Sequence, residues 1–360
     1  MKFLFVRSSP DHGGAEVHFI ALAQALLESG HRVEAMVYPH GFIADELERL
    51  GIRPRRIAFR NAVDPLAHAA LIRTIRAVRP DALVANFGKD YWPLILAGRL
   101  LRVPVLLFRH RVAALKPASG WLLPRLARGF FAVSDFARST YLGQGIAPER
   151  VQVLHNPIDL KRYRFAPDLR REVRASLGID DNAVVVGYCG RMLESKGIYT
   201  LFEATSSAME VEPSLHCLWV GESLDGDRLR ARVAGSPHAS RHHFVGLVDD
   251  PSPYYSAFSL LAFPSIAPET FGRVSIEAQA CGIPVLGSDV GGVPETLIDG
   301  KTGLLLPPDD AVAWRDAILR LCDANRRAAL GEKAREFVKS RFSYPIIAEQ
   351  LVSFLDARVT

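Results

Sequence analysis

Hydrophobic and polar residues follow two alternating patterns along this chain. Short runs of β-branched and aromatic residues are separated by longer segments in which apolar residues recur every three or four positions. The short runs predict buried strands, and the longer segments predict amphipathic helices. Their regular alternation favours an α/β chain with parallel sheets covered by helices.

In the first half, the pattern predicts strands over residues 2–7, 32–38, 81–87, 103–109, 129–133 and 151–154. One helix is expected over 15–29, because Gly30 follows it in the usual C-terminal position. Another is expected over 65–78, ending before Pro80, since the residue preceding a proline disfavours the helical conformation.

The pattern restarts after a polar, arginine-rich stretch at residues 160–174. Strands are predicted over 183–189, 216–221, 242–245, 260–264, 284–288 and 303–306, and a final helix over 344–358. A chain of 360 residues fits two domains better than one core. The simplest architecture is therefore two successive doubly wound sheets, joined near residues 156–163.

Composition narrows the class of protein. Apolar residues make up 49% of the chain and charged residues 23%, which is typical of a folded globular protein. The apolar run at residues 1–7 is too short for a signal peptide, and Arg99 and Arg102 interrupt the longest apolar stretch, 93–108. No Cys-x-x-Cys pair occurs among the isolated cysteines Cys189, Cys217, Cys281 and Cys322. We therefore expect a cytoplasmic protein with reduced thiols.

The small excess of positive charge is unevenly placed. The chain has 44 Lys and Arg against 39 Asp and Glu, a net charge of +5, and arginines cluster in the first half. The clusters are Arg53 with Arg55, Arg56 and Arg60; Arg99 with Arg102; Arg109 with Arg111; and Arg125 with Arg128. Without interleaved aromatics they favour an anionic membrane or substrate over nucleic acid, although a solvated basic face explains them as well.

The segment 121–130 sharpens the membrane hypothesis. It combines Trp121, several leucines, Arg125 and Arg128, as an element at a membrane interface would. The alternative is a core helix that packs under the sheet with its arginines in water. Both interpretations stay open at this point.

The first candidate site is the pair Gly13-Gly14, between the first strand and its helix. Glycines let the backbone approach a ligand closely, and the helix start offers N–H groups to a phosphate. A plain tight turn explains the pair as well, with Glu16 complementing the helix dipole. No Gly-x-Gly-x-x-Gly fingerprint is present, and Glu295 occupies the place of the first glycine of a P-loop ending at 300–302.

The second candidate is the loop 190–197, which follows the strand 183–189. It places Arg191 and Lys196 at the carboxyl end of a strand, where doubly wound sheets bind ligands. Two cations in a partly dry site can compensate the charge of a departing diphosphate. The alternative is two solvated basic residues on an ordinary loop.

The third candidate is the block 269–277, where a buried strand runs through a loop into a helix. Glu269 precedes the helix with Gly272 at its start, so a carboxylate and a bare N–H can meet hydroxyl groups. Glu277 lies inside the helix, flanked by Ile276 and Ala278, where a carboxylate is uncommon without a partner. A helix-dipole glutamate plus an exposed glutamate is the alternative.

These blocks, with Gly13-Gly14 upstream and Gly291-Gly292-Val293-Pro294-Glu295 downstream, resemble glycosyltransferase family 4 in order and spacing. The resemblance implies the GT-B fold, in which two Rossmann-like, doubly wound domains face a cleft. Residues 1–160 would bind the acceptor and residues 161–343 the nucleotide-sugar donor. The final helix, about 344–360, would cross back to the first domain.

The resemblance also implies residue roles in the donor domain. Arg191 and Lys196 would hold the donor diphosphate. Glu269 would contact hydroxyls of the transferred sugar, beside the backbone of Phe271 and Gly272, and Glu277 would bind the ribose hydroxyls.

In the first domain, Gly13 and Gly14 would face the distal phosphate. His110, after the strand 103–109, is similar to the family histidine near the transferred sugar, and a structural histidine is the alternative. Thr270 and Arg273 depart from the family pattern, which more often has a small residue or proline and an apolar residue there.

The family retains anomeric configuration without a metal, and the departing phosphate is thought to accept the acceptor's proton. We therefore expect no metal and no cofactor, with Glu269, His110, Arg191 and Lys196 as the catalytic set. The expected reaction moves a sugar from a nucleotide sugar, UDP-linked in preference to GDP-linked, to a glycan or glycolipid in cell-surface polysaccharide or lipopolysaccharide biosynthesis.

The expected location is the cytoplasm, with peripheral binding at the inner face of the cytoplasmic membrane as a further hypothesis, and no nucleic-acid partner. Two alternatives remain at this point. One is a GT-B enzyme of other chemistry, such as a sugar-nucleotide epimerase or a phosphorylase. The other is a non-catalytic relative that binds glycan or lipid.

Overall fold

The computed structural model describes residues 1–10, 13–59, 61, 64–222 and 224–357. The chain divides into two compact units. Unit 1 is Met1–Pro157 with Phe342–Thr360, and unit 2 is Ile158–Arg341. The chain therefore passes into unit 2 within the joining segment expected from the sequence, residues 156–163.

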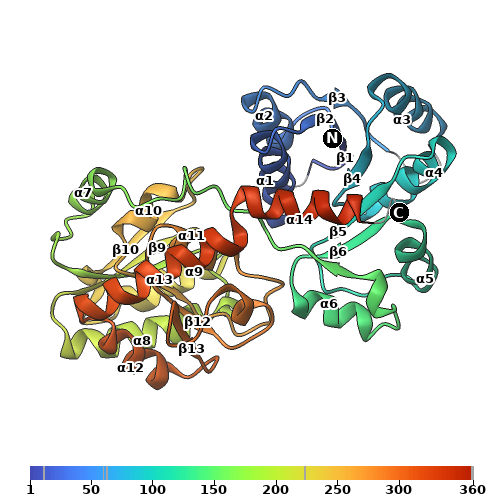
Figure 1. Cartoon of the computed structure of the whole chain (residues 1–360). Coiled ribbons are helices and arrows are strands. Elements are labelled where there is room, and N and C mark those ends of the chain that lie inside the picture. Colours follow the sequence, from blue (N-terminus) through green and yellow to red (C-terminus); the bar gives the residue numbers. More distant parts are fainter. Residues whose placement is uncertain (11–12, 60, 62–63, 223, 358–360) are drawn as a thin grey trace. The chain divides into compact units, whose positions relative to one another are not determined.

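The sheet of unit 1 has seven strands within the described residues, all paired in parallel (Figure 1). Its order is β3-β2-β1-β4-β5-β6-β7. The strands are β1 (Lys2–Arg7), β2 (Arg32–Val37), β3 (Arg55–Arg56), β4 (Ala82–Ala85), β5 (Val105–Arg109), β6 (Gly129–Ala132) and β7 (Gln152–Val153). Each expected strand is confirmed, with small differences at the ends. The sequence missed β3, because its two residues are both arginines and form no apolar run.

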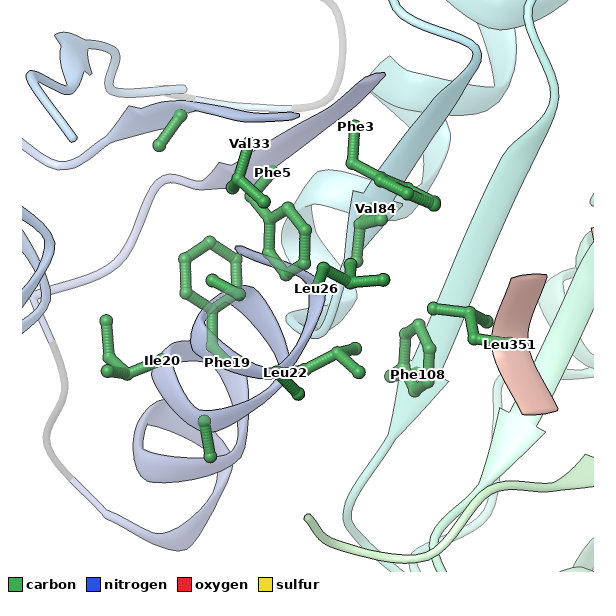
Figure 2. Close-up of a cluster of buried hydrophobic side chains, with 14 of the residues drawn as sticks. Phe3, Phe5, Phe19, Ile20, Leu22, Leu26, Val33, Val84, Phe108 and Leu351 are labelled. Atoms are coloured by element: carbon green, nitrogen blue, oxygen red, sulfur yellow. The ribbon is translucent and has the colours of Figure 1, made fainter. Parts of the chain in front are cut away.

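Helices cover both faces of this sheet. They are α1 (Gly14–Glu28), α2 (Phe42–Arg49), α3 (Pro65–Val78), α4 (Tyr91–Leu101), α5 (Pro117–Leu126), α6 (Asp135–Leu142) and α14 (Tyr344–Asp356), with 3-10 turns η1 (Gly88–Asp90) and η2 (Pro148–Arg150). On one face, Phe5, Phe19 and Phe108 pack with residues of α1, α2 and α14, as Figure 2 shows in part. On the other face, Leu71, Leu94 and residues of α3 to α6 form a second core.

The C-terminal helix α14 belongs to unit 1, which confirms that the chain returns to its first domain. Ile347 and Leu351 are fully buried in the α1 core, because apolar residues repeat along one side of the helix. Arg128 donates from Nη2 to the carbonyls of Phe354, at 3.1 Å, and Leu355, at 2.7 Å. Arg128 therefore holds the end of α14, a role that the sequence did not predict.

Unit 2 repeats the plan with a six-stranded parallel sheet in the described residues. Its order is β10-β9-β8-β11-β12-β13. The strands are β8 (Val184–Cys189), β9 (Leu215–Val220), β10 (His242–Gly246), β11 (Leu260–Phe263), β12 (Val285–Ser288) and β13 (Gly303–Leu306). These match the predicted strands to within one or two residues at either end.

The helices of unit 2 lie around this sheet. They are α7 (Pro167–Ser176), α8 (Ile198–Val211), α9 (Leu224–Ala234), α10 (Ser252–Ala257), α11 (Arg273–Ala280), α12 (Ala311–Arg320) and α13 (Ala324–Phe342), with 3-10 turns η3 (Glu194–Lys196), η4 (Ala239–Arg241) and η5 (Val293–Thr296). The arginine-rich stretch that separates the two patterns in the sequence contains the start of α7. Arg174 of α7 is fully buried and donates to the carbonyls of Ala183, at 2.9 Å, and Ala257, at 2.8 Å.

Both sheets reverse their strand order at one point. In unit 1 the reversal lies between β1 and β4, and in unit 2 between β8 and β11. Loops that leave such strands diverge at the carboxyl edge, and ligands bind in the crevice between them. No helix in the described part of the chain combines the length and apolar character needed to cross a bilayer.

Candidate functional site

Three loops of unit 2 meet at the carboxyl edge of its sheet. The loop 190–197 follows β8, the loop 264–272 follows β11, and the loop 289–292 follows β12. The backbone N–H groups of Ile266 and Ala267 both donate to the carbonyl of Ser195 at 3.0 Å. The N–H of Gly292 donates to the carbonyl of Glu269 at 2.8 Å, so the middle loop is tied on both sides.

Two glycines permit this close approach. Gly197 has a φ of 68°, and a Cβ there would lie 1.9 Å from the carbonyl oxygen of Pro264. Gly291 has a φ of 58°, and a Cβ there would lie 2.4 Å from the carbonyl oxygen of Glu269. Any larger residue would force the loops apart and adopt a strained backbone conformation.

This junction brings Lys196 and Glu269 together. The Nζ of Lys196 contacts Oε1 of Glu269, and the Ser265 hydroxyl donates to the same oxygen at 2.5 Å. Ser265 is fully buried, whereas the side chains of Lys196 and Glu269 are 24% and 16% exposed. A partly buried ion pair of this kind presents donors and acceptors to a ligand while staying fixed in place.

Arg191 begins the same loop as Lys196. Its side chain is exposed, and its carbonyl accepts a hydrogen bond from the Tyr188 hydroxyl at 2.6 Å. The structure therefore keeps the two predicted cations on one loop, but places only Lys196 against the predicted glutamate.

Glu277 is buried on α11, and its partners are protein groups. The Tyr255 hydroxyl donates to Oε2 at 2.7 Å, and Nη2 of Arg273 donates to Oε1 at 3.1 Å. Burial first, and then the nearby Cys189 and Glu277, raise the pKa of Tyr255 well above its ordinary range, so the phenol keeps the proton that it donates. The alternative of an exposed helix glutamate is wrong.

The helix α11 starts at the residues assigned to sugar recognition. Gly272 directly precedes it with a φ of 124°, and a Cβ there would lie 2.8 Å from the ring of Phe263. The side chain of Phe271 is buried. Any contact of Phe271 with a ligand would therefore come from its backbone, as the family resemblance implies.

A second polar cluster lies at the carboxyl ends of β1 and β4 in unit 1. Arg7 contacts Oε1 of Glu16, and its Nη1 donates to Oδ1 of Asn86 at 2.9 Å. The Asn86 side chain donates to the carbonyl of Ala15 at 2.6 Å. Glu16 is therefore half of a buried ion pair rather than a group that only complements the helix dipole.

Gly13, Gly14 and His110 also lie at this edge. Gly13 precedes α1 and Gly14 is its first residue, whereas His110 follows β5, two positions along the sheet from β1. The ring of His110 lies 4.5 Å, centroid to centroid, from the ring of His18, which is fully buried in α1. The predicted glycines and the predicted histidine therefore lie at the same edge of the sheet, and the ring that packs against His110 belongs to a residue without a sequence signal.

Asp90 is the most perturbed carboxyl group near this cluster. It is fully buried, and both the hydroxyl and the backbone N–H of Ser8 donate to it, the N–H at 3.1 Å. Burial raises its pKa to about 6, against the opposing effect of the Ser8 hydrogen bonds.

Several site residues escape sequence analysis. Tyr255 lies 22 positions before Glu277, and no spacing rule links them. Ser265 has a weak signal, because it follows a strand and precedes Glu269 by one helical turn's spacing. Arg7 has a clearer signal, since it is the charged residue that directly follows the apolar run 3–6 of β1. In the described residues, no group of three or more His, Cys, Asp or Glu side chains is arranged to hold a metal ion.

Comparisons with known proteins show which family and fold this chain resembles. Residues 12–162 match the family model described as Glycosyltransferase Family 4, and residues 183–324 match that described as Glycosyl transferases group 1. The D-inositol 3-phosphate glycosyltransferase of Saccharomonospora viridis is 34% identical over 220 residues, 55% of this chain and 48% of that protein. The enzyme of the same name from Mycobacterium bovis is 30% identical over 301 residues, 74% of this chain and 61% of that protein. The chain spans about half the length of the curated relatives that it matches first.

Solved structures are similar over nearly the whole chain. Anabaena Alr3699/HepE, crystallised with UDP and glucose and also with UDP-glucose, is 25% identical, with a TM-score of 0.82 and coverage of 99% of this chain and 100% of that one. A glycosyltransferase from Rickettsia africae is 20% identical with a TM-score of 0.86, covering 100% of this chain and 98% of that one, and shows the shared fold.

The raised pKa of Asp90 predicts a pH-dependent stability difference. Between about pH 4 and pH 6 the folded state keeps this proton while the unfolded state loses it, so the contribution of Asp90 to stability falls as pH rises. The Asp90→Asn variant lacks this loss. Its unfolding free energy relative to the wild type should therefore increase by about 2 kcal/mol from pH 4 to pH 6. Urea unfolding at several pH values measures this, and a constant difference would contradict it.

Proposed function

The chain belongs to glycosyltransferase family 4 and has its GT-B fold, and from that premise we propose a retaining, metal-independent hexosyltransferase. Its donor is a nucleotide sugar, a UDP-sugar in preference to a GDP-sugar. Its acceptor is a glycan or glycolipid of cell-surface polysaccharide or lipopolysaccharide biosynthesis. The observation that carries this proposal is the Lys196–Glu269 pair, held at the point where the strand order of unit 2 reverses.

The choice of donor rests on this pair and on the solved relatives. Anabaena Alr3699/HepE binds UDP and UDP-glucose and is similar to this chain over its whole length. In the proposed complex, Lys196 and Arg191 bind the diphosphate, Glu269 accepts hydrogen bonds from sugar hydroxyls, and Glu277 binds the ribose diol. Tyr255 and Arg273 hold the Glu277 carboxylate in place for that contact.

The charge arrangement supports catalysis by positioning and leaving-group stabilisation. As the bond between the sugar and the diphosphate breaks, negative charge grows on the phosphate oxygen, where Lys196 and Arg191 stabilise it. The same oxygen takes the acceptor's proton, so attack and departure occur on one face of the sugar. Within unit 1, we propose His110 as a catalytic residue and Gly13-Gly14, at the start of α1, as phosphate-binding positions.

The environment of Glu269 disfavours the alternative route to retention. A covalent intermediate needs a carboxylate nucleophile and a second carboxyl group at the reacting carbon. Oε1 of Glu269 is held by Lys196 and Ser265, which stabilise its charge and reduce its nucleophilicity. This supports a role of Glu269 in binding the sugar.

Removing either loop cation should slow transfer while the fold survives. Loss of one group that stabilises developing charge typically costs about a hundredfold or more in rate, so Lys196→Ala and Arg191→Ala should each lose that much in kcat/KM. Lys301→Ala, at an exposed lysine of the same unit, is the matched control and should keep full activity. Sugar transfer from UDP-glucose measures the effect, and wild-type rates in both loop variants would refute the diphosphate assignment.

The two glutamates should separate in nucleotide binding. Glu277→Gln removes a charged acceptor of the ribose diol and should weaken binding of UDP itself by about tenfold or more. Glu269→Gln should leave UDP binding nearly unchanged and impair transfer. Titration calorimetry with UDP distinguishes them, and the reverse pattern would mean that their roles are exchanged.

Metal independence has its own test. If Lys196, Arg191 and backbone N–H groups supply the charge compensation, EDTA should leave the transfer rate nearly unchanged. Transfer that stops in EDTA and returns with magnesium or manganese would contradict this part of the proposal.

A further inference from the structure

Three neighbouring helices of unit 1 contain basic residues and no acidic ones. The helices α3, α4 and α5 have no Asp or Glu within their bounds, whereas the shorter α2 has three. Their exposed charges are Arg73 and Arg76 on α3, Arg99 on α4 and Arg125 on α5. Such a single-sign surface attracts anionic partners.

The three helices form one continuous surface. All of them pack on the same face of the sheet through the core that contains Leu71, Leu94 and Leu123 (Figure 1). The Trp92 ring N–H of α4 donates to the Ser119 hydroxyl of α5 at 3.2 Å. We call the exposed residues of α3, α4 and α5 the α3–α5 face.

Large apolar side chains stand among these arginines. Leu96 and Leu100, one turn apart on α4, are 51% and 64% exposed, and Arg99 lies between them. Trp121 on α5 is 60% exposed, and the guanidinium of Arg125 lies 4.8 Å from its ring centroid. Water-exposed leucine and tryptophan beside arginine is typical of an element that lies in a membrane interface.

Several other arginines of the predicted basic clusters have partners within unit 1. Arg55 donates to Glu34 at 2.6 Å and Arg56 to Glu48 at 3.0 Å, so acidic side chains offset their charge. Arg128 binds the end of α14. Arg60, also predicted as part of a basic cluster, lies outside the described residues. We therefore assign the anion-binding surface expected from the sequence to the α3–α5 face.

We propose that the α3–α5 face docks unit 1 on a bilayer containing anionic lipid. The arginines bind lipid phosphates, while Leu96, Leu100 and Trp121 enter the headgroup region. Nucleic acid would leave the leucines in water, and a second copy of the chain would bring the same positive charge. The proposal rests on the proposed function in one respect: docking would bring unit 1, the proposed acceptor domain, to the bilayer surface where a glycolipid acceptor lies.

The electrostatic part is tested by sedimentation with vesicles. The full chain should bind vesicles of phosphatidylcholine mixed with phosphatidylglycerol at low salt, release at high salt, and ignore pure phosphatidylcholine. The double change Arg99→Glu with Arg125→Glu should lower the partition coefficient about thirtyfold or more, the equivalent of about 1 kcal/mol for each arginine lost.

The matched control reverses the same number of charges elsewhere. Arg171 and Arg228 are exposed arginines of unit 2, so Arg171→Glu with Arg228→Glu changes the net charge equally. This control should bind anionic vesicles much better than the double variant of the α3–α5 face. Equal losses in the two double variants would overturn the proposal, because net charge alone would then explain binding.

The apolar part is tested by fluorescence quenching with brominated lipid. Trp219 and Trp314 are fully buried and Trp92 is half-buried, which leaves Trp121 as the exposed tryptophan of the chain's four. Quenching should occur in anionic vesicles and should largely disappear in Trp121→Phe. Unchanged quenching in that variant would overturn the assignment of the inserted residue to this face.

Each remaining outcome bears on the proposal. Absence of binding to anionic vesicles would refute it. Self-association of the free protein would also refute it if the double change Arg99→Glu with Arg125→Glu abolishes that association, because the face would then bind a second copy of the chain. UDP binding, measured on every variant, should stay at the wild-type level and shows that the variants are folded. A chain that binds UDP but not vesicles refutes the docking alone, and one that binds vesicles but not UDP refutes the proposed UDP-sugar donor alone.

Discussion

The contact of three loop backbones at the carboxyl edge of unit 2 underlies the rest of the site. Gly197 against Pro264, and Gly291 against Glu269, leave no room for a Cβ, so the loops lie closer than ordinary residues allow. Their carbonyls and N–H groups then pair across the junction. Because backbone hydrogen bonds hold the loops together, Lys196 and Glu269 lie on segments that are already fixed relative to each other.

The two units have different polar groups at the points where their strand orders reverse. Unit 2 has a partly exposed ion pair at its strand-order reversal. Unit 1 uses a buried network at its own reversal, in which Arg7 is held by Glu16 and Asn86. Buried charges are tolerated only when paired and hydrogen-bonded, so this network fixes the start of α1 and the loop after β4. This contrast is consistent with the roles that we propose, in which unit 2 binds the donor and unit 1 the acceptor.

The sequence predicted what depends on local pattern. The strands 2–7 and 303–306 and the helix 65–78 have the bounds of β1, β13 and α3, because apolar periodicity and the flanking glycine or proline define them. The short motifs also placed Lys196, Glu269 and Glu277 correctly at the ends of buried strands or on the following helix. What escaped were partners distant in sequence, such as Tyr255 for Glu277 and Arg128 for α14, since such contacts exist only once the sheet has formed.

The central claim is that the loop junction of unit 2 binds a nucleotide-sugar donor. A crystal structure of the chain with UDP-glucose tests it most directly. We predict the diphosphate on Lys196 and Arg191, the glucose hydroxyls on Glu269, and the ribose on Glu277. Nucleotide bound away from these side chains, or a diphosphate whose charge is met by other groups, would contradict the account.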